Sequence, residues 1–510
     1  MPTLYTALRA RHRSEVVPPS PPLPKSEVFA APPDKTLLAT EQSLAEKIVT
    51  PAETVKEKRP TKRIIVIGAG LAGLCAAYEL LGLGYDVMVY EARDRVGGRV
   101  ERVQGFAPGK IAEGGGELIG SNHPLWNSYK HQFNLTFSDA RDYGNSPVRL
   151  KGATLTFEQS GELTDEMEKQ FKLLTNLAAT ILDPFEPWTN RNAAALDAIS
   201  VGKWIEKSNC SPDTQHALRV MFAADNGVPV EEQSLLGFLA MVKGGGLDRY
   251  WTDTELFRCE GGNQSLAEHF AARLGSLKRP VALGTPVKSL FPSGNRIGVL
   301  LDDHGNEKRD EADEVICAVP PSVWKTINVS TFPELAKRFT NPPAMGSNVK
   351  YLMRLDNRFW ENFASSPTLS EDGPVNLTWE TTEADKTGDF VVVAFSGSRD
   401  SDECVNWPST RRDQNYVQAM RDPYPGIQQR IQGTKFMNWP EQEWTLASYY
   451  FPRLGEVTSW GPFWKAGYGG WLHFAGEHTC YAFVGYMEGA LASGYRLARK
   501  LAVRDQVLSA

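Results

Sequence analysis

Long apolar runs are missing from this sequence of 510 residues. No stretch approaches the roughly 18 apolar residues that a helix needs to cross a bilayer, so we expect no transmembrane segment and no membrane partner. The N-terminal stretch MPTLYTALRARHRSEV is basic, but no apolar segment follows it, which argues against a secretory signal. We therefore expect a soluble protein, cytoplasmic or of unknown location.

Cysteine is scarce, with six residues in the whole chain and no CxxC spacing. Few, scattered cysteines in a chain of this length are typical of buried thiols rather than of a disulfide framework or a metal site. We expect free thiols and no bound metal. The six residues are Cys75, Cys210, Cys259, Cys317, Cys404 and Cys480.

An excess of positive charge is also absent, because 55 Lys and Arg residues stand against 61 Asp and Glu residues, a formal net charge of -6. This balance argues against nucleic acid as a partner. Aromatic residues are plentiful, with 13 Trp, 16 Tyr and 23 Phe, enough for a large core and an aromatic-lined pocket. The sequence leaves the oligomeric state open, and a homo-oligomer is compatible with it.

Residues 1–60 are rich in proline and predict an extended or disordered tail. The folded part is expected to begin at Lys62. Apolar runs at Arg63–Ile67 and Asp86–Tyr90 predict strands, and the apolar spacing of residues 71–81 predicts a helix between them.

Later patterns alternate between helix and strand. Residues 160–245 favour helices, and residues 281–320 return to strand patterns. Residues 349–397 predict a second, largely antiparallel sheet. WLHFAGEHT predicts a strand followed by a turn, and residues 487–503 predict a closing helix with small residues on one face.

A glycine-rich turn joins the first predicted strand to the first helix. Gly68 permits a tight turn, Gly70 lets the backbone approach a pyrophosphate, and Gly73 allows close packing of helix on strand. The helix N-terminus adds free amide donors and a partial positive charge. Glu91 ends the second predicted strand, where a carboxylate accepts hydrogen bonds from ribose hydroxyls. This combination predicts a dinucleotide site but does not separate FAD from NAD.

The run EARDRVGGR at residues 91–99 is too rich in glycine and charge for a buried strand. It is either a solvated turn or a loop that returns to the pyrophosphate. Together with GAGLAGL it resembles the FAD-dependent amine oxidase family, which includes monoamine, polyamine and L-amino acid oxidases. The resemblance extends over residues 62–505. It implies FAD as the cofactor, with Arg93, Gly98 and Arg99 among the residues that bind it.

A second block near the C-terminus carries the same resemblance. It implies that Gly476 and Glu477 lie on the pyrophosphate and ribityl side of FAD, and that Tyr486 and Met487 lie at the isoalloxazine ring. It also implies that Val287 contacts adenine through its backbone. The simpler alternative for this block is a packed terminal helix with a glycine-rich start.

The resemblance also implies catalytic residues. GSNVK, which ends at Lys350, is similar to the segment in which a family lysine holds a water beside flavin N5; otherwise Lys350 is an ordinary surface lysine. Tyr449 and Tyr486 would form two walls of an aromatic cage for an amine, or else be core tyrosines. Ser448 stands where monoamine oxidases carry the cysteine that bonds FAD, so we expect non-covalent FAD.

The expected fold class is α/β with α+β: a Rossmann-type FAD-binding domain, a mixed-sheet substrate domain and a helical insertion. The FAD-binding domain is expected to be discontinuous, because its motifs lie far apart in the sequence. Its segments are residues 61–125, 255–335 and 465–505, the helical region is residues 126–254, and the substrate-binding domain is residues 336–464.

The implied reaction is FAD-dependent oxidative deamination with O2, giving ammonia and hydrogen peroxide. GGGELIGSNHP at residues 114–124 resembles segments of bacterial L-amino acid oxidases, so L-amino acids, oxidised to 2-oxo acids, are the first expectation. Monoamine or polyamine oxidation is the alternative, and a flavoprotein without turnover is another. The arginine that clamps the substrate carboxylate in many L-amino acid oxidases is absent from residues 114–124. A tyrosine hydroxyl, a backbone amide or a distant arginine would have to replace it.

Overall fold

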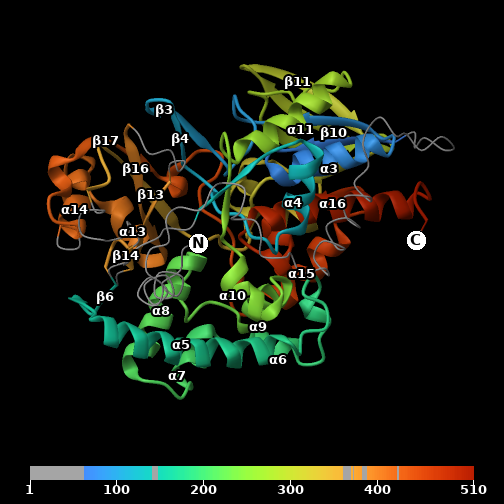
Figure 1. Cartoon of the computed structure of the whole chain (residues 1–510). Helices are drawn as coiled ribbons and strands as arrows, with labels where there is room; N and C mark the ends of the chain where they lie inside the picture. Colours follow the sequence, from blue (N-terminus) through green and yellow to red (C-terminus); the bar gives the residue numbers. More distant parts are fainter. Residues whose placement is uncertain are drawn as a thin grey trace.

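The structure is a computed structural model that describes residues 62–140, 148–359, 369–370, 373–381, 388–421 and 424–509. The predicted tail at residues 1–60 lies outside the described residues. Figure 1 shows a part that combines helices with a parallel sheet, a second sheet to its side, and a group of helices below both. The predicted fold class is confirmed by this architecture.

A four-stranded parallel sheet forms the centre of the first part. β1 (Arg63–Ile67) lies between β2 (Asp86–Tyr90) and β12 (Glu314–Cys317), and β18 (Leu472–Phe474) follows β12 at the other edge. The predicted bounds of β1 and β2 are confirmed. Most of their side chains are buried, which is why both strands read as continuous apolar runs rather than as alternating patterns.

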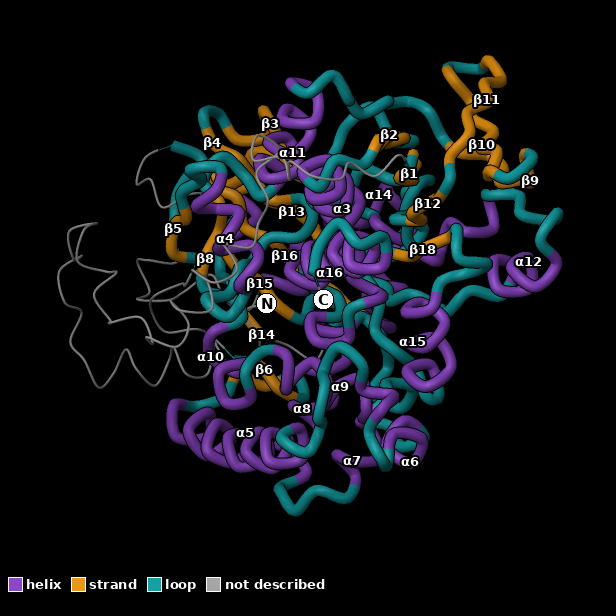
Figure 2. The backbone as a smooth tube through the Cα atoms, turned by 90° about the vertical axis from the view of Figure 1, so that its right-hand side faces the viewer, coloured by secondary structure: helices purple, strands orange, loops and turns teal. Residues whose placement is uncertain are grey.

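Two helices pack against each other beside this sheet, α3 (Leu71–Gly82) and α16 (Met487–Arg504), as Figure 2 shows. Small residues permit the contact, since a Cβ on Gly494 would lie 2.4 Å from the carbonyl oxygen of Ala72. α11 (Gln264–Ser276) also packs on α3. The predicted first and closing helices are therefore held together by apolar and small side chains from opposite ends of the chain.

A three-stranded antiparallel sheet consists of β9 (Val287–Ser293), β10 (Arg296–Asp303) and β11 (Asn306–Ala312). The strand pattern expected from residue 281 begins later, because Ala282 instead forms an isolated bridge with Tyr90. β11 is polar and largely exposed, so its sequence lacks the apolar alternation that would have predicted it.

The second sheet has five strands in the order β14-β15-β16-β13-β17. Each described pairing in this sheet is antiparallel, so the expected mixed sheet is an antiparallel one. Long apolar runs such as VVVAF suit its centre, where the strands are buried. Its strands are β13 (Asn348–Leu355), β14 (Leu369–Ser370), β15 (Leu377–Glu380), β16 (Phe390–Gly397) and β17 (Ile431–Met437).

The helices predicted over residues 160–245 form the lower group in Figure 1. The longest begins at a capping box in which Thr156 and Gln159 bond each other's backbone amides. Another, α8, ends at Gly227 in the left-handed conformation that favours glycine. The group comprises α5 (Phe157–Ala178), α6 (Ala193–Asp197), α7 (Val201–Glu206), α8 (Pro212–Asn226), α9 (Leu235–Gly244) and α10 (Tyr250–Asp253).

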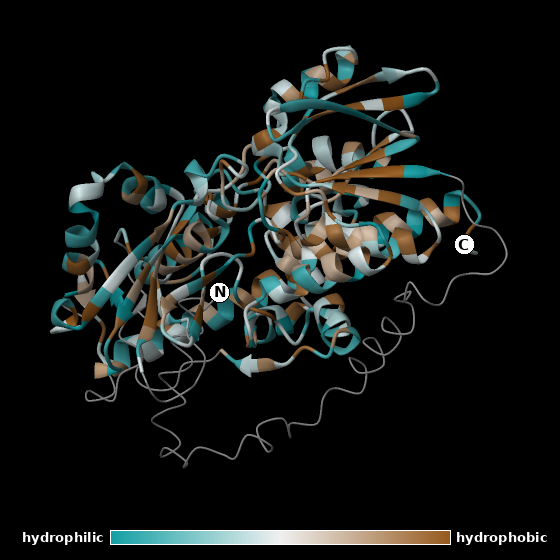
Figure 3. Ribbon diagram, turned by 90° about the horizontal axis from the view of Figure 1, so that it is seen from above, coloured by the Kyte–Doolittle hydropathy of each residue, from teal (hydrophilic) through white to brown (hydrophobic). Residues whose placement is uncertain are grey.

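Shorter elements connect these parts. Figure 3 shows that hydrophobic residues concentrate in the central strands and in the helices that cover them. The remaining helices are α4 (Pro124–Gln132), α12 (Pro333–Thr340), α13 (Ser398–Asn406), α14 (Ser409–Met420) and α15 (Glu456–Ala466), and the remaining strands are β3 (Arg102–Ala107), β4 (Lys110–Glu113), β5 (Phe137–Asp139), β6 (Arg149–Leu150), β7 (Ala153–Thr154) and β8 (Phe257–Cys259).

The six cysteines are free thiols, as predicted, and all but the half-buried Cys210 are buried. Within the described ranges, no helix has the length and apolar character needed to cross a membrane.

Candidate active site

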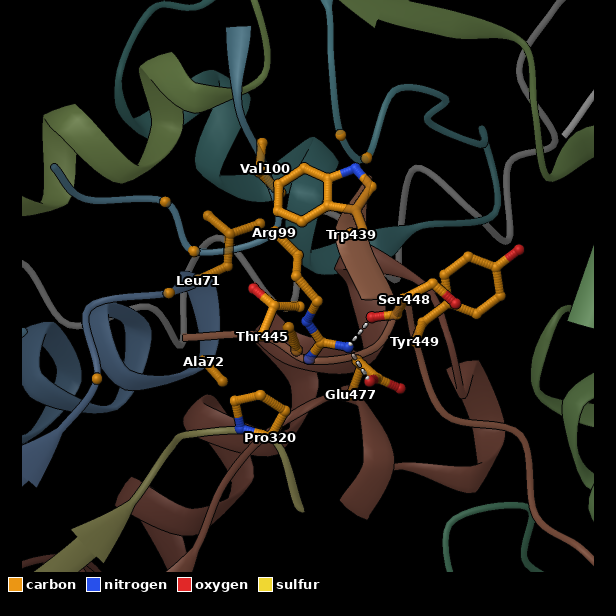
Figure 4. Close-up of a pocket in the computed structure, with 18 of the residues that line it drawn as sticks. Leu71, Ala72, Arg99, Val100, Pro320, Trp439, Thr445, Ser448, Tyr449 and Glu477 are labelled. Carbon is orange, nitrogen blue, oxygen red and sulfur yellow. Dashed lines mark hydrogen bonds and ion pairs between the residues drawn. The ribbon is translucent and has the colours of Figure 1, made fainter. Parts of the chain in front are cut away.

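One deep cavity lies where the parallel sheet, the second sheet and the C-terminal block meet. It encloses about 1730 Å³, the open space at its mouth included. Every site residue predicted from the sequence lines this cavity, except Gly73, which lies behind its wall. Figure 4 shows side chains from separate stretches of the chain around it, among them Leu71, Arg99, Pro320, Tyr449 and Glu477.

The glycine-rich turn forms one wall. Gly68 has a φ of +102°, which favours glycine. At Gly73 a Cβ would lie 2.1 Å from the carbonyl oxygen of Gly68 and 3.1 Å from the Cβ of Ala318, so the predicted close packing of helix on strand is confirmed. At Gly70 a Cβ would meet no atom within 4 Å, because this residue borders the cavity. That a pyrophosphate approaches Gly70 stays a prediction.

The beginning of α3 lies at this wall and is suited to an anion. No side-chain hydrogen bond caps the helix, and its first turn carries no acidic residue, so its first amides stay available. Glu91, only 4% exposed, accepts hydrogen bonds from the backbone amides of Ala69 at 2.6 Å and Arg93 at 2.9 Å. Its two oxygens are thereby oriented, and each retains capacity for a ribose hydroxyl.

Two arginines of the predicted loop join the N-terminal motif to later parts of the chain. Arg99 donates to Glu477 at 2.6 Å and to the carbonyl oxygen of Ser448 at 2.8 Å, as Figure 4 shows. Arg93 donates to the hydroxyl of Thr445. The charged run at residues 91–99 is therefore not a solvated turn, since these contacts fix it at the cavity wall.

The C-terminal block forms the adjoining wall. Glu477 also accepts hydrogen bonds from the amides of Tyr450 at 3.2 Å and Gly485 at 3.0 Å. Tyr486 is the N-cap of α16 and Met487 is its first residue, and both line the cavity. The helix therefore begins at the cavity, where its N-terminal partial charge acts on whatever binds there.

Further backbone bonds fix the wall that contains Val287, the first residue of β9. The amide of Glu91 donates to the carbonyl oxygen of Ala282 at 2.8 Å, and the amide of Thr285 donates to the carbonyl oxygen of Glu91 at 2.8 Å. These bonds place Val287 beside the ribose-binding carboxylate predicted at Glu91. Adenine contact through its backbone remains a prediction.

Two more predicted glycines complete the cradle. Gly98 has a φ of +60°, and a Cβ there would lie 3.3 Å from the Cα of Gly70. At Gly476 a Cβ would lie 2.3 Å from the ring of His478. The cavity thus has a glycine edge, uncapped helix ends, an oriented carboxylate and two arginines. This donor set fits FAD, which combines an anionic pyrophosphate, a ribose and a flat ring system.

Lys350 lies in β13 and is only 6% exposed. Its ammonium donates to Glu117 at 2.7 Å and to the carbonyl oxygens of Gly115 at 2.8 Å and Glu113 at 3.2 Å. The surface-lysine alternative is therefore wrong. Because the three ammonium hydrogens already have protein acceptors, a water held by Lys350 would have to share or replace one of them. That role stays a prediction.

Glu117 is the centre of this buried network. It accepts hydrogen bonds from Arg258 at 2.7 Å and from the indole of Trp379 at 2.9 Å, in addition to Lys350. Burial alone would raise the pKa of Glu117, but Lys350 and Arg258 outweigh burial and hold it at about 2. The carboxylate is thus ionised, and its hydrogen bond holds the Lys350 ammonium beside the cavity.

Glu113 lies next to this network in a different state. Burial raises its pKa to about 8, so the carboxyl is neutral at pH 7. One of its oxygens accepts from the amide of Asn263 at 2.6 Å, and the other is buried without a hydrogen-bond partner among the described atoms.

The two predicted cage tyrosines line the cavity and so are not ordinary core residues. Tyr449 donates its hydroxyl to the carbonyl oxygen of Asp225 at 2.6 Å. Tyr486 packs edge-on against the imidazole of His123, with 5.6 Å between ring centroids. Burial lowers the pKa of His123 to about 3, so this imidazole is neutral. These contacts fix both tyrosine rings.

Ser448, at the position predicted to decide how FAD is attached, is 4% exposed. Its hydroxyl donates to the amide oxygen of Asn348 at 2.6 Å. A serine offers no thiol for a thioether bond, so non-covalent attachment stays the prediction.

Several cavity residues were not predicted from the sequence. Glu117 had a signal, because a carboxylate in the run GGGELIG is out of place unless it is paired. Four aromatic residues had none, because they come from strands and loops whose approach to the cavity depends on the tertiary fold. They are Trp379, Phe395, Trp439 and Trp444.

Comparisons with known proteins agree with this geometry. The family described as flavin containing amine oxidoreductase matches residues 71–502. A probable flavin-containing monoamine oxidase A of Dictyostelium discoideum is 25% identical over 472 residues, covering 88% of this chain and 98% of its own length. Putrescine oxidase of Kocuria rosea is 27% identical over 412 residues, covering 76% and 84%.

Solved structures share the fold. Putrescine oxidase with bound putrescine superposes with a TM-score of 0.78 at 23% identity, covering 88% of this chain and all of its own. Cyclohexylamine oxidase from Brevibacterium oxydans IH-35A gives a TM-score of 0.77 at 22% identity, with the same coverage. The chain belongs to the flavin-containing amine oxidoreductases, as an FAD-dependent enzyme of that family.

Proposed function

We propose that this enzyme oxidises the carbon–nitrogen bond of small primary amines at the tyrosine-lined end of the cavity. FAD, when bound, supplies the hydride acceptor and the path of electrons to O2, which gives hydrogen peroxide. The residues of the chain bind and orient the amine and exclude water. Relatives named monoamine oxidase and putrescine oxidase support an amine as the substrate.

The pairing of the cationic side chains in the cavity supports an amine rather than an amino acid as the substrate. In the described part of the chain, the cationic side chains that line the cavity are Arg93, Arg99 and Lys350. Arg93 and Arg99 are bonded to Thr445, Glu477 and backbone oxygens in the walls assigned to FAD, while Lys350 is bonded to Glu117. Among the described residues that line the cavity, no lysine or arginine is thus left unpaired beside the tyrosines to bind a substrate carboxylate.

The tyrosines suit a neutral amine. A buried site of low polarity disfavours an ammonium ion and so favours the form that can be oxidised. The rings of Tyr449 and Tyr486 offer apolar contact to the carbon chain and a π-face to the nitrogen. Because hydrogen bonds and ring contacts fix both tyrosines, the amine enters a preformed site rather than ordering one.

Oxidation of L-amino acids to 2-oxo acids remains the alternative, and the resemblance of GGGELIGSNHP favours it. Placing an α-carboxylate in this cage costs several kcal/mol unless a cation or hydrogen bonds compensate. A tyrosine hydroxyl could serve only if Tyr449 gave up its bond to Asp225, and Lys350 only if it left Glu117.

Matched substrate pairs test the proposal. We would measure peroxide production with phenethylamine against L-phenylalanine, and with pentylamine against L-norleucine. The amine of each pair should have the higher kcat/KM, by at least about tenfold, because its partner places an unpaired carboxylate in the cage. A preference for the L-amino acids, with D-enantiomers inactive, would establish the alternative. A flavin that stays oxidised on anaerobic mixing with every compound would indicate a flavoprotein without turnover.

A further inference from the structure

Asp225 is an unpaired acid at the tyrosine-lined end of the cavity. It is the penultimate residue of α8, and its backbone oxygen accepts the hydroxyl of Tyr449. One oxygen of its carboxylate is buried and finds no hydrogen-bond partner among the residues that the structure describes. Buried carboxylates are normally paired or hydrogen-bonded, so this oxygen is suited to a partner from outside the chain.

Three tyrosines surround this carboxylate. Burial is the largest cause that raises the pKa of Tyr250, Tyr449 and Tyr486, and the charge of Asp225 adds to the rise in each. The carboxylate is therefore close to all three rings. Tyr449 and Tyr486 line the cavity, whereas Asp225 and Tyr250 are not among its lining residues, so the acid lies next to the tyrosine wall rather than on it.

No described lysine or arginine serves as a counter-ion for this acid. Burial raises the pKa of Asp225 to about 7, and no described lysine or arginine offsets that rise. This contrasts with Glu117, where Lys350 and Arg258 outweigh burial. A carboxylate close to tyrosine rings is a combination that binds ammonium and guanidinium groups.

The position of Asp225 separates it from the reacting nitrogen. Asp225 lies beyond the hydroxyl end of Tyr449, whose ring lines the cavity. An ionised carboxylate at the reacting nitrogen would hold that nitrogen as ammonium, which cannot be oxidised. A carboxylate at the far end of the cage instead holds a cation that does not react.

We propose that Asp225, with Tyr250, Tyr449 and Tyr486, binds a second cationic group on the substrate, so that the preferred substrates carry an ammonium or guanidinium group at the end opposite the reacting amine. This proposal rests on the proposed function, because it takes amines as the substrates. It adds their class, which is aliphatic diamines and aminoalkyl guanidines. Asp225 acts on specificity and leaves the oxidation of a simple amine to the rest of the site.

Matched pairs that differ only in the distal charge test this site. Peroxide-coupled kinetics of the FAD-loaded enzyme would compare butylamine with 1,4-diaminobutane, pentylamine with 1,5-diaminopentane, and pentylamine with 4-aminobutylguanidine. In the wild type, kcat/KM for the best dication should exceed that of its partner by at least about tenfold, mainly through KM. In Asp225→Asn the ratio should fall to about one, because the distal cation loses the carboxylate that binds it.

Asp213→Asn is the matched control, because Asp213 lies on the same helix but is exposed and paired with Lys151. It should keep the wild-type ratio. Unfolding temperatures of both variants should equal that of the wild type, since asparagine is isosteric and the carboxylate oxygen has no partner to lose. A ratio near one in the wild type, or a ratio that Asp225→Asn leaves intact, would overturn the proposal.

The same variants separate this proposal from the proposed function. If only L-amino acids are oxidised, the choice of amines fails, and L-lysine against L-norleucine then tests Asp225 in the same way. A preference for L-lysine that Asp225→Asn abolishes would support the cation site. Equal use of L-lysine and L-norleucine would overturn it.

Discussion

At the glycine-rich end of the cavity, Arg99 is bonded to Glu477 and to a backbone oxygen, and Glu91 is oriented by two amides. At the tyrosine-lined end, Asp225 keeps one buried oxygen without a partner in the described chain. At the first end, which we call the completed end, the protein itself pairs the charged groups. At the second end, which we call the open end, we expect a ligand to supply the missing partner.

The difference follows from what each end has to bind. The cofactor is chemically constant, so groups that are fixed in advance lose little entropy when it binds. The substrate, in contrast, differs among members of a family. A charged substrate is bound by protein groups of opposite charge, and these groups are costly to bury when the substrate is absent. An acid with one buried, unpaired oxygen next to a preorganised cavity therefore indicates the charge of the ligand rather than a requirement of the fold.

The largest expected effect comes from two glycines at the cofactor end. Gly73→Ala places a Cβ 2.1 Å from the carbonyl oxygen of Gly68, so backbone must move. We expect loss of bound FAD together with a loss of stability of about 1–3 kcal/mol. Flavin absorbance of the purified protein and chemical denaturation measure the two effects.

Gly70→Ala is the matched control. Its Cβ meets no protein atom within 4 Å but projects toward the predicted pyrophosphate position. It should lower the FAD content while leaving the stability of the FAD-free protein at the wild-type value. Full FAD content in Gly70→Ala would show that the pyrophosphate does not approach this turn.

The second prediction concerns whether FAD is attached covalently or non-covalently at the completed end. Because Ser448 provides no thiol, trichloroacetic acid precipitation should release all the flavin into the supernatant. Absorbance of pellet and supernatant measures the distribution. Flavin that remains with the denatured pellet would show a covalent link at a residue other than Ser448.

The sequence predicted the completed end of the cavity far better than the open one. Gly68, Gly70, Gly73 and Glu91 act through local backbone geometry within one strand–turn–helix unit, so their spacing alone indicates their place. The same holds for β1 and β2, whose apolar runs gave their bounds.

The open end depends on contacts between distant segments. Asp225 ends a helix and reaches the cage only because Tyr449, 224 residues later in the sequence, donates to its carbonyl oxygen. Lys350 was placed near the cavity by resemblance, but its pairing with Glu117 joins strands that no local pattern relates. β11 was not predicted for a simpler reason. Its side chains are mostly exposed, so its sequence shows no alternation of apolar and polar residues.

The third prediction concerns Lys350, which also lines the cavity. Lys350→Met should slow flavin reduction or reoxidation on the order of 100-fold, if this lysine positions a water for the reaction. It should also lower the free energy of unfolding by about 3 kcal/mol, because Glu117 loses one of its partners. Stopped-flow absorbance under anaerobic and aerobic conditions separates the two half-reactions.

The double variant Lys350→Met with Glu117→Gln separates chemistry from stability. Removing both charges of the Lys350–Glu117 pair should restore part of the stability, since no carboxylate is left underpaired but Arg258 loses its counter-ion. The slow half-reaction should persist. Recovery of the rate together with stability would mean that Lys350 serves only the fold, and unchanged rates in Lys350→Met would remove it from the reaction.

The last prediction concerns Glu113, a second acid with a buried oxygen that lacks a partner in the described chain, and neither Glu113 nor Asp225 is among the residues that line the cavity. The pKa of Glu113 rises from an ordinary 4.5 to about 8 on burial, so the folded state keeps a proton that the unfolded state releases. Stability from this group is therefore lost as the pH rises from about 4.5 to about 8. Glu113→Gln mimics the protonated form and should be more stable than the wild type at pH 8, on the order of 2–4 kcal/mol, with the advantage vanishing near pH 4.5. Urea denaturation across this range, with the exposed Glu231→Gln as a control, measures the difference. A constant difference across the range would mean that Glu113 is ionised and partnered in the folded protein, in contrast to the buried oxygen of Asp225, which has no partner among the described residues.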